Sequence, residues 1–275
     1  MKQPIRRWLA GLGAVTAAAA SVLSLSSLTA SQAATAGKAA PARAGTAARN
    51  LQPAYTPPGR VLRPGMKGPA IRALQRRLAE LKYYPGKIDG EFSADTLEAV
   101  WAFKEVQGIN TSKNADIVGH VMERDLVKPR LPRVLVPRGG SNLRIEVSLT
   151  REVLVLYHHN KVELISHVSA GGGYYYPCPG GGGTCGPAIT PDGNFRALSF
   201  APGWVTVPLG YMYNPVFFIG RAYAIHGDIP VPLQPVSHGC VRIPMYIAAF
   251  FHKLVHLGAR HGTPVYIRGL APGTR

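Results

Sequence analysis

The residues best suited to chemistry lie close together in the C-terminal part of the chain. His226 ends an apolar run, and Cys240 follows Gly239 a short distance further on. A thiol at its ordinary pKa is a poor nucleophile at neutral pH, but a neighbouring imidazole can take its proton and hold the ion pair. Gly239 allows a sharp turn, and a turn near Cys240 would point backbone N–H groups at a developing oxyanion. The pattern predicts catalysis by Cys240 with His226 as its base.

Two other interpretations fit the same residues. His226, His238 and Cys240 could ligate zinc, although no fourth ligand is evident and the His-x-Cys spacing is unusual for zinc. Cys240 could instead be a buried structural cysteine, which is a common state for this residue type. One His and one Cys alone are compatible with all three interpretations, so the residues around them must distinguish catalysis from a zinc site or a structural cysteine.

The longer motif resembles that of a known family. Ser237-His238-Gly239-Cys240, with Ile225-His226-Gly227 upstream, is similar to the L,D-transpeptidase (YkuD-type) catalytic domain. Further matching elements are Ser169-Ala170-Gly171, Thr190-Pro191-Asp192-Gly193-Asn194-Phe195 and Gly262-Thr263-Pro264-Val265. The resemblance spans residues 142–269 and implies a β-sandwich-like fold and a cysteine transpeptidase that needs no metal or organic cofactor.

The resemblance also implies a role for each residue of the motif. Cys240 would be the nucleophile, and His226 would be its general base and then the acid for the leaving amine. The carbonyl of Gly227 would orient the imidazole, and N–H groups near Gly239 and Cys240 would form the oxyanion hole. The remaining residues expected to shape the site are His238 and Ser237.

Substrate contacts are expected from three further side chains. Arg242 would either bind a substrate carboxylate or brace the turn; the family pattern often has Asn at this position, and many members have Arg. Tyr211 and Tyr213 are expected in the wall of the pocket. The spacing from His226 to Ser237 is shorter than in most members, which indicates a trimmed lid.

The implied reaction has two steps and takes peptidoglycan stem peptides and glycan as its partners. The thiol attacks the carbonyl of the third residue of a tetrapeptide stem, D-Ala leaves, and an amine of a neighbouring stem resolves the thioester into a 3→3 cross-link. Such an enzyme would serve peptidoglycan synthesis, cell wall biogenesis and cell shape. An L,D-carboxypeptidase, a non-catalytic peptidoglycan-binding wall protein and a metal-dependent wall hydrolase are the alternatives.

The chain has three cysteines, and two of them are close in sequence. Cys178 and Cys185 lie in a Gly/Pro-rich loop and would pair readily outside the cytoplasm, which leaves Cys240 as the odd thiol. We expect the insertion at 171–186, with its Tyr174-Tyr175-Tyr176 run, to be either a disulfide-bridged surface loop or a contact for glycan.

The N-terminus has the order of a secretory signal. Lys2, Arg6 and Arg7 precede an apolar stretch over 8–25, and several small-x-small sites follow. This order predicts a cleaved signal peptide at 1–33 and secretion to the cell wall, whereas a retained membrane anchor is the alternative.

The formal net charge of +17 indicates a polyanionic partner. For an exported chain that partner would be an anionic cell-envelope polymer and not nucleic acid, although the charge could also serve solubility alone. The sequence does not determine the oligomeric state.

Between the signal and the catalytic motif we expect two linkers and a helical module. Residues 34–56 and 129–141 lack apolar periodicity and are predicted to be linkers. Residues 57–128 are predicted to hold three helices, with Ser93 as an N-terminal cap and Gly108 as a helix end. The apolar positions at helical spacing are Ile71, Leu74, Leu78 and Leu81 after Pro69, then Leu97, Val100, Phe103 and Val106; a third helix is expected near 116–126.

This region resembles the peptidoglycan-binding domain type 1 family. The matching positions are Gly65-Met66-Lys67-Gly68, Leu74-Gln75, Leu78, Gly86, Asp89-Gly90-Glu91-Phe92, Thr96, Ala99-Val100 and Phe103. The resemblance implies a module that holds cell-wall glycopeptide, whereas a helical spacer without a ligand is the alternative.

From residue 142 the apolar pattern changes to a period of two, which is typical of antiparallel strands. Strands are expected over 142–149, 153–157, 162–169, 195–200, 204–207, 216–219, 222–226 and 264–268, with a helix over 244–257 ended by Gly258. The expected fold class is therefore multidomain α and β, with a small three-helix N-terminal module and a mainly β, sandwich-like domain at 142–270 that carries one or two short helices.

Overall fold

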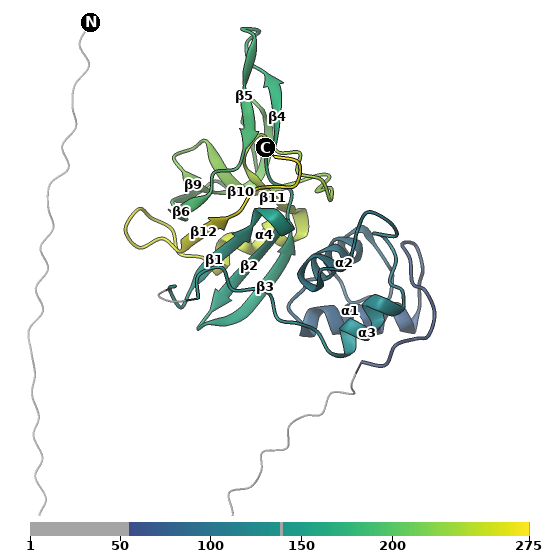
Figure 1. The fold of residues 1–275 in the computed structure, drawn as a ribbon. Coiled ribbons are helices and arrows are strands. Elements are labelled where there is room, and N and C mark those ends of the chain that lie inside the picture. Colours follow the sequence, from purple (N-terminus) through teal and green to yellow (C-terminus); the bar gives the residue numbers. More distant parts are fainter. Residues whose placement is uncertain (1–54, 138–139, 275) are drawn as a thin grey trace, which may run out of the picture. The chain divides into compact units, whose positions relative to one another are not determined.

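Three helices precede a mainly β region in the computed structural model, which describes residues 55–137 and 140–274 (Figure 1). The predicted signal peptide at 1–33 and nearly all of the predicted linker at 34–56 lie outside these residues. Among the residues described, no helix has the length and apolar character needed to cross a membrane.

The first two helices begin where the sequence predicts, and the second also ends there. Helix α1 (Pro69–Glu80) starts at its proline and buries its apolar stripe. Helix α2 (Ala94–Gln107) is capped by Ser93 Oγ, which accepts from Thr96 N at 3.4 Å, and it ends at Gly108 with φ of 72°. Both ends satisfy groups that a helix leaves unpaired.

Helix α3 (His120–Val127) is shorter than predicted and starts about one turn later. The residues before it are held in a turn, because Lys104 Nζ donates to the carbonyls of Asn114 and Ala115 at 2.8 and 2.6 Å. The Asn114 carbonyl also accepts from Ile117 N at 3.4 Å, and helix α3 begins only at His120.

Two larger sheets and one two-stranded sheet make up the β region (Figure 1). The first has the order β3-β2-β1-β12-β6, and the second has the order β11-β10-β9-β7, with β8 paired to β9. Their strands are β1 (Arg144–Ser148), β2 (Val153–His158), β3 (Lys161–His167), β6 (Gly193–Arg196), β7 (Ser199–Phe200), β8 (Trp204–Val207), β9 (Gly210–Ile219), β10 (Tyr223–Asp228), β11 (Val241–Pro244) and β12 (Pro264–Arg268).

The purely antiparallel expectation is wrong for two pairs. Strand β12 runs parallel to β1, and β11 runs parallel to β10. Strands β10 and β11 are parallel because residues 229–240 carry the chain back to the start of β10 before β11 begins. This crossover places His226 opposite Arg242 in register, and so it builds the candidate site.

The two sheets and helix α4 (Met245–Phe251) enclose a common apolar core, which confirms the sandwich-like expectation. The outer face of the first sheet packs on the helices: Val153, Val155 and Tyr157 of β2 belong to the same buried cluster as α1 and α2. Because β2 is apolar on both faces, it alternates between two cores. Helices and sheets therefore form one continuous body over the described part of the chain.

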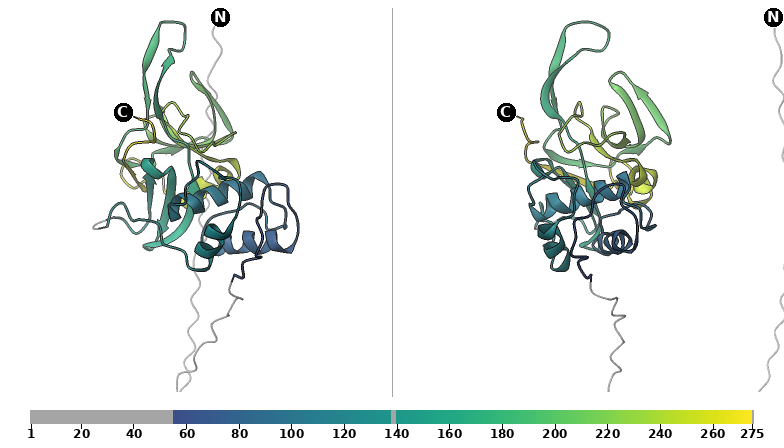
Figure 2. Two further views of the ribbon diagram at one scale, coloured as in Figure 1. Left: turned by 45° about the vertical axis from the view of Figure 1, so that its right-hand side comes forward. Right: turned by 90° about the vertical axis from the view of Figure 1, so that its right-hand side faces the viewer.

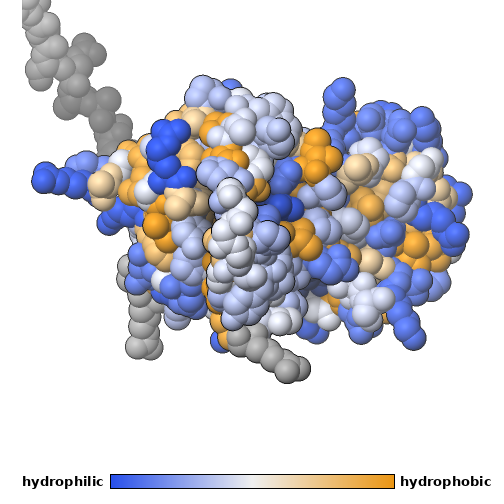
Figure 3. All heavy atoms as spheres, turned by 90° about the horizontal axis from the view of Figure 1, so that it is seen from above, coloured by the Kyte–Doolittle hydropathy of each residue, from blue (hydrophilic) through white to orange (hydrophobic). Residues whose placement is uncertain are grey.

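The loop expected at 171–186 is instead a β-hairpin. Strand β4 (Gly172–Pro177) pairs with β5 (Thr184–Ile189), and Cys178 and Cys185 form a disulfide near its tip. This hairpin and the β8–β9 hairpin rise as two arms from the same end of the β region (Figure 2). Seen from above, that end mixes small apolar patches with hydrophilic residues (Figure 3).

The helix expected over 244–257 ends early. Helix α4 stops at Phe251, and a short 3-10 turn, η2 (His252–Leu254), follows it. The His252 ring stacks on Phe200 with centroids 4.0 Å apart, and Val255 is already extended. Gly258 therefore lies beyond the helix instead of ending it. A second 3-10 turn, η1 (Leu149–Arg151), joins β1 to β2.

Candidate active site

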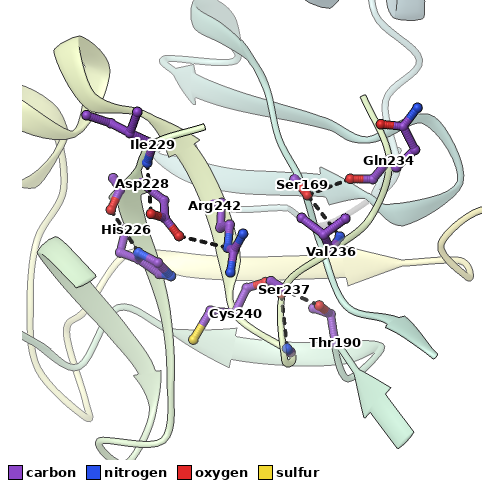
Figure 4. Close-up of polar contacts among 12 residues, drawn as sticks. Ser169, Thr190, His226, Asp228, Ile229, Gln234, Val236, Ser237, Cys240 and Arg242 are labelled. Carbon is purple, nitrogen blue, oxygen red and sulfur yellow. Dashed lines mark hydrogen bonds and ion pairs between the residues drawn. The ribbon is translucent and has the colours of Figure 1, made fainter. Parts of the chain in front are cut away.

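The parallel pair β10–β11 brings the predicted base and nucleophile to one place. His226 lies within β10, and Cys240 directly precedes β11. Both line a cavity of about 840 Å³. Figure 4 shows the thiol and the imidazole extending toward the same space. The two groups therefore face the same cavity from neighbouring parts of the β10–β11 pair.

The imidazole of His226 is held in one orientation by its own strand. Nδ1 lies 2.9 Å from the carbonyl oxygen of Gly227. A carbonyl oxygen only accepts, so Nδ1 carries the proton and Nε2 keeps its lone pair. Burial lowers the pKa of His226, against the smaller opposing effects of Gly227 and Asp228. The ring is therefore a neutral base with a free acceptor nitrogen.

The thiol of Cys240 is also neutral in this structure. Burial raises its pKa, which the N–H of Ala224 and the charge of Arg242 only partly oppose. Sγ donates a weak bond of 3.8 Å to the carbonyl of Ala222; within the described residues its hydrogen-bond partner is this carbonyl and not His226. Burial disfavours the charged form of both groups, so it favours a neutral thiol and a neutral imidazole over the expected thiolate–imidazolium ion pair.

A network of short hydrogen bonds fixes the turn before Cys240. Ser237 Oγ donates to the Cys240 carbonyl and accepts from Gly239 N at 3.0 Å. Thr190 Oγ1 accepts from Gly171 N at 2.8 Å and lies 3.5 Å from the same Cys240 carbonyl (Figure 4). The N–H of Gly239 is thereby occupied, so the predicted oxyanion hole has one donor fewer than expected.

Glycine at 239 is required by the fold of this turn. Its φ is +134°, and a Cβ there would lie 2.6 Å from the Tyr223 ring and 2.8 Å from the Ile189 carbonyl oxygen. Gly227 is crowded as well, since a Cβ would lie 2.8 Å from that of Ala248 in α4. Both glycines allow close packing around the strand that carries His226.

Arg242 braces the site through an ion pair. Its Nε lies 2.9 Å from Asp228 Oδ2, across the parallel pair and beside His226 (Figure 4). Its backbone N and O both pair with Ser169. Asp228 was missed by sequence reasoning, although an acid two residues after the predicted base is a usable signal. The Ala222 carbonyl was also missed, and no residue type reveals it because a backbone atom makes the contact.

The two hairpin arms form walls of the cavity. Tyr176 and Pro179 come from the disulfide-bridged arm, and Trp204 and Tyr211 come from the other. Tyr213 is not among the lining residues; its ring packs 5.3 Å from that of Trp204. Two sides of the site therefore come from the hairpins.

His238 also lines the cavity, but it faces the first arm. Its ring meets the edges of Tyr176 and Tyr174, with centroids 4.6 and 5.8 Å apart. Burial and the nearby Arg242 lower the pKa of His238. Across residues 55–137 and 140–274, no three His, Cys, Asp or Glu side chains gather closely enough to hold a metal ion.

Comparison with known proteins identifies two families. The sequence model of a peptidoglycan binding domain matches residues 67–117, and that of the L,D-transpeptidase catalytic domain matches residues 142–267. No curated protein matches the chain.

Solved structures give a similar result. An L,D-transpeptidase from Xylanimonas cellulosilytica DSM 15894 is 31% identical, with a TM-score of 0.67, over 78% of this chain and 100% of that chain. An L,D-transpeptidase (Yku) from Stackebrandtia nassauensis is 19% identical, with a TM-score of 0.43, over 80% of this chain and 100% of that chain. The first similarity covers the whole of the compared chain at a level that shows common membership. This chain therefore belongs to the L,D-transpeptidase family, and it carries a peptidoglycan binding domain match ahead of the catalytic region.

Proposed function

We propose that this transpeptidase works through a thioester on Cys240 and joins peptidoglycan stems by 3→3 cross-links. The observation that carries the proposal is the placement of Cys240 and a neutral, pre-oriented His226 on one cavity wall. The family membership supplies the reaction class, and the match at 67–117 supports peptidoglycan as the polymer that is bound.

In the first step the thiol proton passes to His226 Nε2 as Sγ attacks the carbonyl carbon of the third stem residue. The tetrahedral oxyanion is stabilised by the N–H of Cys240, because that of Gly239 already donates to Ser237. The intermediate collapses as the C–N bond to D-Ala breaks. The imidazolium of His226 returns its proton to the departing amine, and an acyl-thioester remains on Cys240.

In the second step a side-chain amine of a neighbouring stem attacks the thioester. His226 takes a proton from that amine, the new amide bond forms, and the C–S bond breaks. The sulfur leaves as a thiolate and recovers a proton from the imidazolium. The complete cycle starts and ends with a neutral His226 and a neutral Cys240 thiol, which is the state that burial favours.

The two arms supply the substrate groove in this proposal. Trp204 and Tyr211 are about half exposed or more beside the nucleophile, and aromatic faces of this kind suit flexible peptide and sugar rings. Arg242 is engaged by Asp228, so we assign it a bracing role. The basic chain acts outside the cytoplasm at the wall, after removal of the signal peptide over 1–33.

Incubation with defined tetrapeptide muropeptides, followed by mass analysis of the products, tests the proposal. Transpeptidation predicts free D-Ala and cross-linked dimers, and both should disappear in the Cys240→Ala variant. Tripeptide monomers alone would instead favour an L,D-carboxypeptidase. Undiminished D-Ala release by Cys240→Ala would exclude the thioester.

Two further measurements separate the remaining alternatives. A reactive thiol should be acylated by a carbapenem, whereas a wall-binding protein with an idle cysteine should stay unmodified. A metal-dependent hydrolase would show bound zinc by elemental analysis and would lose activity with a chelator. Retained activity without zinc would end that alternative.

A further inference from the structure

A buried histidine outside the catalytic pair links the helices to the crossover of the active site. His167 is the last residue of β3, and its side chain is fully buried. Nδ1 lies 2.8 Å from Glu105 Oε1 on helix α2, and Nε2 lies 3.1 Å from the carbonyl oxygen of Pro232. One ring thus joins segments more than 60 residues away on either side of it in sequence.

The proton arrangement of this ring is determined by its two partners. The Pro232 carbonyl only accepts, so Nε2 must carry a proton. Nδ1 then either donates to an ionised Glu105 or accepts from a protonated one. In both cases a single proton lies between His167 and Glu105, and the ring donates to Pro232. Loss of Glu105 would leave Nδ1 without its buried partner.

The surroundings of His167 are acidic and largely dry. Burial raises the pKa of Glu105 and of Glu98 to about 7, and that of Glu152 to about 8. Burial lowers the pKa of His167, but Glu105, the Pro232 carbonyl and Glu98 together raise it above the ordinary value. The edge of the Trp101 ring closes the remaining side, with centroids 5.6 Å apart.

A buried pair of this kind is weak evidence for stability alone, because removing charges from water costs about as much as their attraction returns. Glu105 even leaves Oε2 without a hydrogen bond, and Glu152 does the same with Oε1. Apolar residues of similar volume would satisfy the packing. The arrangement therefore favours a positional role over a purely stabilising one.

The segment that His167 holds is the crossover between the base and the nucleophile. Its three prolines at 230, 232 and 235 have no N–H, so the crossover has few donors of its own. Its carbonyls must find donors elsewhere. The end of β3 supplies them: after His167, Ser169 Oγ donates to Gln234 O at 2.7 Å and accepts from Val236 N at 3.1 Å.

The same stretch of chain continues into the catalytic turn. Ser237 N donates to the Ala170 carbonyl at 3.0 Å, and Ser169 pairs with Arg242 through both backbone groups. Residues 167–170 thus hold the crossover from Pro232 through to the turn of Cys240. His167 is the first of these anchors, and it is the one connected to the helical region.

We infer that His167 is a positioning residue for the acyl transfer, held in place by Glu105 of helix α2, so that the peptidoglycan-binding region helps to set the geometry of the catalytic turn. The inference rests on the proposed cysteine mechanism. A displacement of the nucleophile by about 1 Å is enough to slow a positioned reaction about 100-fold. Helix α2 would then be part of the catalytic apparatus and not merely a tethered anchor.

Full-length variants test the inference through kcat, KM and the alkylation rate of Cys240 by iodoacetamide. His167→Gln can replace one of the two ring contacts but not both, so we expect kcat and alkylation to fall roughly 10- to 100-fold with little change in KM. Glu105→Leu should act in the same direction, by about tenfold. Glu105→Gln should recover most of that loss, because its amide N–H can donate to Nδ1 of the neutral ring.

Glu98→Gln is the matched control on the same helix. Glu98 influences His167 through its charge, so this variant should stay within about twofold of the parent. The positioning role is overturned if folded Glu105→Leu keeps the parental kcat and alkylation rate. It is equally overturned if the loss matches the unfolded fraction measured by thermal unfolding.

Two more outcomes are informative. If His167→Gln does not fold, the comparison of Glu105→Leu with Glu105→Gln still decides the question. If Cys240→Ala retains D-Ala release, the cysteine mechanism fails first. An inactive Cys240→Ala with unaffected Glu105 variants would instead leave the mechanism standing and reject only the positioning role.

Discussion

Two regions of the molecule differ in how fully their polar groups are hydrogen-bonded: the buried cluster around Gln75 in the helical region, and the catalytic pair His226 and Cys240. Gln75 is fully buried on α1, and its amide donates to Asp89, Glu91 and Thr96 and accepts from Gly90 N at 2.8 Å. At the catalytic pair, His226 Nε2 is left with its lone pair, and the Cys240 thiol donates only a weak bond of 3.8 Å to the Ala222 carbonyl.

This difference in hydrogen bonding distinguishes a structural polar cluster from a reactive one. A buried amide with every hydrogen bond made holds a loop and has nothing left to react with. A base nitrogen and a thiol with unused capacity can exchange a proton when substrate arrives. Gln75 and Asp89-Gly90, which belong to the resemblance to the peptidoglycan-binding family, therefore stabilise the loop at 86–92 through buried hydrogen bonds.

The largest effect in this comparison is expected from His226→Gln, which removes the free base nitrogen. We expect D-Ala release to fall about 100- to 10,000-fold, while thermal unfolding changes little. In the parent, burial keeps the pKa of His226 below its ordinary 6.5, so the imidazole should lose its basic form, and the rate should fall, only on acidification below pH 6.5. A rate profile measured between pH 4.5 and 8 checks both points; an unchanged acid limb in His226→Gln would contradict the assignment.

Gly239→Ala should disturb the turn without touching either reacting group. The added Cβ meets the Ile189 carbonyl oxygen and the Tyr223 ring, so we expect a loss of roughly 10- to 100-fold in kcat. Gly258→Ala is the matched control, because its φ of +128° is similar but a Cβ there meets nothing within 4 Å. Equal effects in the two variants would mean that backbone strain, and not the crowded turn, governs the loss.

Gln75→Leu should disrupt the buried polar cluster of the helical region. The apolar side chain leaves the Gly90 N–H unsatisfied, at a cost of about 1–3 kcal/mol in the free energy of unfolding. Thermal unfolding should report the loss, and the exposed neighbour Arg76→Ala should not show it. The rate per folded molecule should stay at the parental value if this cluster has only a structural role.

The smallest effect on the catalytic rate is expected from Glu152→Gln, which should instead change how stability depends on pH. Burial raises the pKa of Glu152 from 4.5 to about 8 in the folded protein. Its contribution to stability is therefore fully present below pH 4.5 and is lost as the pH rises through about 8, because the unfolded chain ionises first. The parental melting temperature should fall between pH 5 and 8.5, and it should fall less in the variant. Parallel curves would show that Glu152 is not the buried acid responsible.

The sequence predicted individual helices and strands better than it predicted which strands pair and in which direction. The spacing of apolar residues and the capping residues predicted the positions of α1 and α2. Pro69, Ser93 and Gly108 are informative because they determine the backbone conformation of adjacent residues. The parallel pairs were missed, since pairing direction depends on where a distant segment returns. The hairpin at 172–189 was missed for another reason: its strands are rich in glycine and tyrosine and lack an apolar face.

The candidate site shows the same division. Cys240 and His226 were found from residue type and motif, and the structure places both on the cavity wall. Their neutral resting state could not be predicted, because it follows from burial. The roles of the Ala222 carbonyl and of His167 depend on tertiary contacts between segments that are remote in sequence.

The most direct test of the account is rapid quenching of the enzyme with a tetrapeptide muropeptide, followed by intact-protein and peptide mass spectrometry. The account predicts an adduct on Cys240 with the mass of the muropeptide less D-Ala, formed as fast as D-Ala is released and absent from Cys240→Ala. Release of D-Ala while Cys240 stays unmodified, or an acyl group on another residue, would contradict it.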